Sequence, residues 1–206
     1  MSAEQSWPVP VAQAEVTEAP ETEPVEQEPA AEAEPEQPAA PVRAPGELEI
    51  PDGVAVLEGS PSGAERHVGV VVARQHGEVT NQLLESALSA LIRAGVTSER
   101  ITVMPVPGPF ELPIGAMALA KTRRFGCVVA LGCLLPEDGE QVAAEAASGL
   151  QLAGLETGVP VAFGVVSAEN EAVAMSATDR GAEAVRTALE MADLFGQIRA
   201  QAKTAG

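Results

Sequence analysis

The feature that most constrains this fold is a set of four apolar runs, each followed by a segment with helical spacing. The runs cover Val68–Ala73, Ile101–Val106, Cys127–Leu134 and 160–167. Runs dominated by apolar residues are typical of strands that are covered on both faces. Because alternating strands and helices form right-handed βαβ units, the sequence predicts an α/β fold with a parallel sheet between two layers of helices.

The segments between the runs carry the start and stop signals of helices. We expect helices over 80–95, 111–122, 140–158 and from about 181 onward. In the first of them Thr80 is placed to cap the N-terminus and Gly95 to end the helix. A fifth strand is predicted at 53–59, "GVAVLEG", separated from the first run by a turn rich in Gly, Ser and Pro.

The first part of the chain differs sharply in composition from the rest. Residues 1–46 are rich in Glu, Pro and Ala, and their ten Glu and one Arg supply half of the net charge of -18. Such a segment buries too little apolar surface to offset its ordering entropy. We therefore predict a disordered arm over 1–50 and one folded domain over 51–206. Trp7 is either an exposed residue of this arm or a short docking motif for a partner.

Composition also excludes several classes of function. The N-terminus lacks the pattern of a signal peptide, and no apolar run approaches the roughly twenty residues of a membrane span. The acidic balance argues against nucleic acid and anionic membranes as partners. Cys127 and Cys133 lie six residues apart in one strand pattern, too far for a disulfide. Reduced, buried thiols in a cytoplasmic protein are expected.

Function in such a fold is expected in the loops that follow the strands. The turn at Gly108–Glu111, "GPFE", combines a tight turn, an aromatic ring and a carboxylate at the start of a helix. Two interpretations stay open for it: a helix entry in which Glu111 favours the helix dipole, or a turn that lines a ligand pocket. No metal site is predicted.

Three motifs in fixed order make the sequence similar to a known family. They are "PGPFELP" at 107–113, "ALGC" at 130–133 and "TGVPVAFGV" at 157–165. With these motifs the stretch from about 54 to 195 resembles the lumazine synthase family. The resemblance implies a flavodoxin-like α/β/α subunit that forms homopentamers, in some members 60-subunit shells, with active sites between neighbouring subunits. In that family an N-terminal strand adds to a neighbour's sheet, which suits 53–59.

The resemblance also implies a reaction and the residues around its substrate. The family condenses 5-amino-6-ribitylamino-uracil with 3,4-dihydroxy-2-butanone 4-phosphate to 6,7-dimethyl-8-ribityllumazine, without a metal or organic cofactor. The reaction proceeds through an imine, loses phosphate and closes the second ring. The positions that match the family's substrate pocket are Phe110, Glu111, Leu134, Leu135, Phe163 and Arg180.

Two loops depart from the family pattern. After "ALGC" the family has Val-Ile-Arg-Gly-Asp-Thr and then a His, whereas this chain has a shorter loop with Glu137, Asp138 and Glu140. These three carboxylates are expected to repel a phosphate dianion at close range. The loop after the last strand is also shorter and has Ser176 near the position of the family's phosphate-binding Arg. His76 is either a relocated acid/base or an exposed loop residue.

Three hypotheses follow from this comparison. The chain is a working lumazine synthase with an altered site, a non-catalytic pentamer or shell scaffold, or a binding protein for a lumazine or flavin. The departures in the two loops favour weak or lost activity. A partner of the acidic arm is a further expectation.

Overall fold

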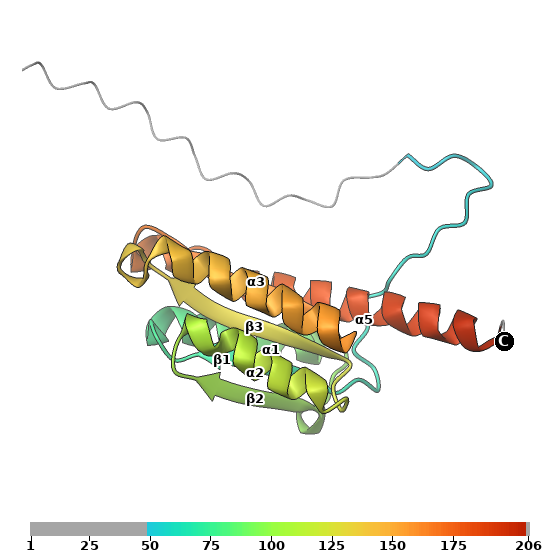
Figure 1. Ribbon diagram of the computed structural model, residues 1–206, viewed down its shortest axis with the longest axis horizontal. Helices are drawn as coiled ribbons and strands as arrows, with labels where there is room; N and C mark the ends of the chain where they lie inside the picture. The colour runs from blue at the N-terminus through green and yellow to red at the C-terminus, as the bar shows by residue number, and fades with distance from the viewer. Residues whose placement is uncertain (1–48, 205–206) are drawn as a thin grey trace, which may run out of the picture. The chain divides into compact units, whose positions relative to one another are not determined.

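A computed structural model describes residues 49–204, and the residues from Asp52 onward form one compact unit (Figure 1). Its sheet has four parallel strands in the order β2-β1-β3-β4. The strands are β1 (Val68–Ala73), β2 (Ile101–Val106), β3 (Cys127–Leu134) and β4 (Val161–Ser167). The predictions for residues 1–48, including Trp7 and most of the arm, lie outside the described residues.

The helices form a layer on each face of the sheet. They are α1 (Gly77–Arg93), α2 (Leu112–Lys121), α3 (Glu140–Thr157), α4 (Glu171–Met175) and α5 (Arg180–Thr204). In Figure 1, α2 and α3 lie in front of the sheet and α1 and α5 lie behind it. This confirms the predicted α/β/α arrangement with a flavodoxin-like parallel sheet. None of the helices between residues 49 and 204 combines the length and the apolar character of a membrane-spanning segment.

Burial explains why the central strands have such uniform composition. Every residue of β1 and β3 is buried, because both strands have neighbours on each side and helices on each face. The edge strands β2 and β4 expose part of their length. Val68 pairs with Ile101 on one side and with Cys127 on the other, so the strands run nearly in step. Their carboxyl ends therefore meet at one edge of the sheet.

The first helix begins earlier than predicted. It starts at Gly77, and His76 precedes it with a left-handed φ of 52°. The prediction of Thr80 as the N-cap is wrong, since Thr80 lies inside the helix. Its N–H donates to the His76 carbonyl at 3.0 Å, and its hydroxyl to the same oxygen at 3.3 Å. At the other end of the fold α3 stops, as predicted, at Gly158, which has a φ of 65°.

The predicted strand at 53–59 is wrong for the single chain. This segment has no strand partner and packs along α5 instead. The Gln197 amide donates to the Glu58 carbonyl at 2.8 Å, and the Ser60 N–H donates to Asp193 at 3.1 Å. A strand needs a neighbouring strand to form hydrogen bonds with its backbone groups. Within one chain, side chains of α5 form some of these hydrogen bonds instead. Val54 and Val56 stay exposed.

Candidate functional site

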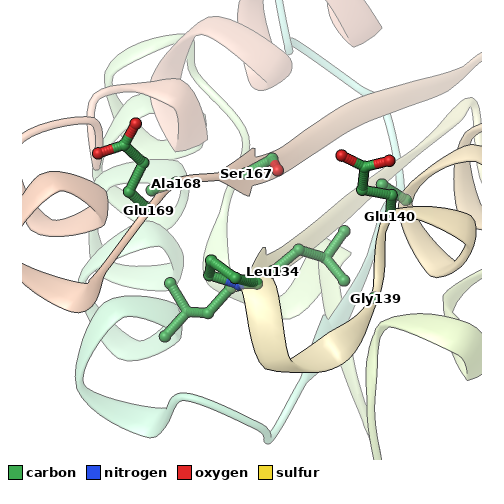
Figure 2. A pocket seen from close by; sticks show the side chains of 9 residues that line it. Leu134, Gly139, Glu140, Ser167, Ala168 and Glu169 are labelled. Atoms are coloured by element: carbon green, nitrogen blue, oxygen red, sulfur yellow. The ribbon is translucent and has the colours of Figure 1, made fainter. Parts of the chain in front are cut away.

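A pocket of about 420 Å³ lies at the carboxyl ends of β3 and β4 (Figure 2). Its lining residues are Leu134, Leu135, Pro136, Gly139, Glu140, Ala143, Ser167, Ala168 and Glu169. Figure 2 shows Glu140 and Glu169 on opposite sides of the pocket, with Ser167 between them. The position at strand ends is where ligands bind in open α/β sheets.

The wall formed by the loop after β3 is a compact 3₁₀ turn, η3 (Pro136–Asp138). Pro136 at its first position has a fixed φ that suits a helical turn. The Asp138 carboxylate reaches back and accepts a hydrogen bond from the Leu135 N–H at 2.8 Å. Gly139, with a φ of 85°, then directs the chain into α3. The short loop is thus closed by its own aspartate.

The same carboxylate joins this loop to the loop after β1. The Gln75 amide donates to Asp138 Oδ1, and His76 Nε2 lies 2.8 Å from Asp138 Oδ2. Both His76 and Asp138 are largely buried, with 11% and 7% of their side chains exposed, so the interpretation of His76 as an exposed loop residue is wrong. On the other side of the ring, His76 Nδ1 lies 3.6 Å from Glu171 Oε1 at the start of α4. Both nitrogens of the imidazole therefore face carboxylates of the same chain.

The environment of Asp138 keeps its carboxyl ionised. Burial alone would raise its pKa, but hydrogen bonds from the Leu135 N–H, His76 and Gln75 hold the pKa below the usual 3.8. Because an ionised carboxylate only accepts hydrogen bonds, His76 Nε2 carries the hydrogen of this contact. The pair fixes the position of the imidazole and links the β1 loop to the β3 loop.

The pocket has a strongly acidic rim. Glu140 and Glu169 line it, Glu137 is exposed on the neighbouring turn, and no lining residue is basic. Two like unit charges about 4 Å apart repel by about 1 kcal/mol in bulk water and about 4 kcal/mol at an effective dielectric constant of about 20. A phosphate dianion is therefore disfavoured here, whereas an uncharged ring or polyol is not.

Among the residues expected at the substrate pocket, Leu134 and Leu135 line the cavity. Phe110 and Glu111 lie on η2 (Pro109–Glu111), the short turn after β2, and do not line it. The Glu111 carboxylate accepts a hydrogen bond from the Gly108 N–H at 3.0 Å and so closes its own turn. Phe110 is 58% exposed. The contacts of both residues with a ligand stay predictions.

The other two expected residues also lie outside this cavity. Phe163 is half-exposed on the edge strand β4, opposite Ala130 of β3. Arg180 begins α5, and its guanidinium lies 3.9 Å from Glu183 one turn later. Neither residue lines the cavity of the single chain. Their roles stay predictions as well.

Sequence reasoning missed the contact between His76 and Asp138. It placed Asp138 among the carboxylates that would repel phosphate, whereas the structure turns this side chain toward the loop itself. The available signal was the order of the strands, since β1 and β3 are neighbours and their end loops must meet. Within 49–204 no group of three or more His, Cys, Asp or Glu residues is arranged to hold a metal ion.

Comparison with known proteins agrees with this architecture. Residues 65–196 match the family model described as 6,7-dimethyl-8-ribityllumazine synthase. The chain is 39% identical over 153 residues to the 6,7-dimethyl-8-ribityllumazine synthase of Yersinia pestis (strain Pestoides F), covering 70% of this chain and 98% of the relative. The protein of the same name from Yersinia pseudotuberculosis serotype O:1b (strain IP 31758) gives the same identity and coverage. The chain belongs to the 6,7-dimethyl-8-ribityllumazine synthase family.

Proposed function

We propose that this protein is a homo-oligomeric member of the family with weak or absent synthase activity. The observation that carries the proposal is the acidic pocket at the strand ends, which Glu140 and Glu169 line without a basic partner. The reaction implied by the family must hold a phosphate and then release it. Basic side chains normally serve that purpose together with free helix N–H groups. Here the uncapped N-terminus of α3 lies at the pocket, but its first residue is Glu140, whose charge opposes an anion.

The proton transfers of the reaction lack an evident group as well. A general base needs a free lone pair within hydrogen-bond reach of the substrate. His76 Nε2 is held by Asp138 at 2.8 Å, which leaves the lone pair of Nδ1. Nδ1, however, points toward Glu171 at 3.6 Å, and His76 is not among the residues that line the pocket. His76 therefore supports the loops in this proposal and does not act on the substrate.

Exposed apolar side chains support self-association. They lie on β2, β4, η2, α2 and α3, and comprise Val103, Phe110, Ile114, Leu152, Leu155 and Phe163. Large exposed apolar groups on several elements often mark protein interfaces. We infer a homopentamer, the assembly that the family resemblance implies, with a 60-subunit shell as its larger form. The segment around Val54 and Val56 would then pair with a neighbour's sheet.

The deciding experiment is an assay of the purified protein with both family substrates, followed by lumazine fluorescence. We expect the rate to equal that of a control without enzyme, while an intact family enzyme is active under the same conditions. Light scattering on the same sample tests the assembly. A rate far above the control would contradict the proposal, and His76→Ala would then show whether His76 is a relocated acid/base.

A binding function is the second candidate. Phe110 and Phe163 expose aromatic surface on which a planar ring can stack. An uncharged ring with a ribityl chain avoids the phosphate repulsion of the acidic pocket. Titration of the protein with riboflavin, read by quenching of flavin fluorescence, tests this candidate. Saturable quenching that Phe163→Ala reduces would favour it over a pure scaffold, and linear quenching would exclude it.

Cys127 and Cys133 are both buried free thiols, which suits a reducing compartment such as the cytoplasm. A partner that binds the acidic residues 1–50 is part of the same hypothesis.

A further inference from the structure

A second pocket, of about 350 Å³, lies at the amino ends of β3 and β4, opposite the acidic pocket. Arg123 and Arg124, from the connection between α2 and β3, line it together with Arg199 of α5. Phe125 and Val159 also line it and are almost fully buried. Residues distant in sequence thus bring three arginines to one cavity.

These arginines have no acidic partner within the described residues. Residues 1–48 hold 11 of the chain's 30 acidic and one of its 12 basic side chains, so 49–204 carries 19 acidic and 11 basic ones. Despite this excess, each ion pair within 49–204 involves other basic groups. Three positive charges around one cavity repel one another. An anion that binds among them would relieve this repulsion.

Helix capping does not explain the three arginines. The helices α2 and α3 both end here, and basic side chains often bind the free carbonyls of a helix end. One carbonyl at each of these ends is already occupied, since the Thr122 hydroxyl donates to the Leu119 carbonyl at 2.7 Å and the Gly158 N–H donates to the Gly154 carbonyl at 2.9 Å. None of the three guanidinium groups donates a hydrogen bond to a carbonyl of residues 49–204.

We propose that this arginine pocket binds a phosphate-bearing small molecule. A guanidinium fork matches two oxygens of a phosphate or a carboxylate. One carboxylate offers two oxygens and a single charge. A phosphate or pyrophosphate group has enough acceptor oxygens and negative charge to bind several guanidinium groups at once. The buried Phe125 and Val159 form an apolar wall for the organic part. This inference is independent of the proposed function, because the pocket lies at the other end of the strands.

Calorimetric titration of the full chain with inorganic pyrophosphate, at constant ionic strength, tests the proposal. We expect saturable binding near one site per chain. Arg199→Gln should weaken it about tenfold, because it removes one charge-assisted contact. Arg186→Gln is the matched control, since Arg186 is an exposed residue of the same helix outside the pocket. It removes the same charge and should leave the affinity unchanged.

Three results would overturn the proposal. One is heat that never saturates, and another is an equal loss of affinity in Arg199→Gln and Arg186→Gln, which would show attraction by overall charge. The third is citrate binding as tightly as pyrophosphate, which would show no preference for phosphate. Arg124→Gln provides a second variant should Arg199→Gln disturb α5. A circular dichroism spectrum like that of the wild type confirms the fold of each variant.

Discussion

At the scale of single residues, Asp138 shows how strongly local geometry decides what a charge does. From the sequence alone, a carboxylate in the loop after a strand is interpreted as a catalytic group or as a charge that repels a phosphate. In the structure it accepts hydrogen bonds from the Leu135 N–H, Gln75 and His76. The direction of the side chain could not be predicted, because it depends on a contact between loops 62 residues apart.

Asp138→Asn is expected to lower the free energy of unfolding by about 1–3 kcal/mol, because the amide leaves one buried donor without its acceptor. The loss should depend on pH. The pKa of the Asp138 carboxyl is lower in the folded protein than its usual value of 3.8. The carboxylate therefore contributes its full stabilisation at pH values above the pKa of the unfolded chain. This contribution is lost as the pH falls below 3.8 and passes through the pKa of the folded state. Urea unfolding at a series of pH values measures this.

The neighbouring exposed Glu137 provides the control for that experiment. Glu137→Gln changes the same charge one residue away and should leave stability nearly unchanged. A difference between wild type and Asp138→Asn that stays constant from about pH 6 to about pH 3 would contradict the account.

The two thiols provide a second prediction at this scale. Burial raises the pKa of Cys127 to about 12. Burial, together with the carboxylates of Asp138, Glu171 and Glu137, raises the pKa of Cys133 to about 11. Because the thiolate is the reactive form, we expect no fast reaction of the native protein with Ellman's reagent at about pH 8, and release of both thiols in denaturant. Rapid labelling of the native protein would refute the assignment.

At the scale of elements, the sequence determined most of the fold. The apolar run at Cys127–Leu134 predicted β3 with its bounds, because a strand buried on both faces needs apolar residues throughout. The start of α1 was misplaced, since His76 takes a left-handed conformation, which is uncommon for any residue other than glycine. The segment 53–59 has the composition of a strand, but a strand exists only where a partner pairs with it.

The packing of α5 against α1 gives a prediction with opposite signs at two glycines of one helix. A Cβ at Gly181 would lie 2.2 Å from the Leu83 carbonyl oxygen of α1, whereas a Cβ at Gly196 would meet nothing within 4 Å. We expect Gly181→Ala to destabilise by about 1–3 kcal/mol through overpacking. Gly196→Ala should stabilise by about 0.5–1 kcal/mol through helix propensity.

Urea unfolding at one protein concentration compares the two variants with the wild type. Equal effects of the two substitutions would mean that α1 and α5 are not in the close contact described.

At the scale of the whole molecule, the site depends on long-range geometry. The sequence predicted that chemistry would lie at the carboxyl ends of the strands, and Leu134 and Leu135 do line a pocket there. It could not predict that Arg123 and Arg199 share a cavity at the opposite end, because only the packing of α5 brings them together. Charge is divided accordingly, with carboxylates around one pocket and arginines around the other.

The proposed function requires assembly, and the exposed leucines of α3 offer an apolar surface for it. Leu155 is 75% exposed and Leu152 is 50% exposed on α3. Burial of a leucine contributes about 1.5–3 kcal/mol, so a shared interface would lose affinity at least about tenfold in Leu152→Ser/Leu155→Ser. The neutral substitution leaves the net charge of -18 per chain unchanged. Light scattering across a dilution series should therefore show smaller species for the variant.

Val173→Ser, which removes an exposed apolar side chain from α4, is the comparison variant. It should assemble like the wild type if the interface involves α3. If the wild type and both variants dissociate over the same concentration range, neither α3 nor α4 contributes these side chains to the interface. A monomeric wild type would contradict the proposed scaffold.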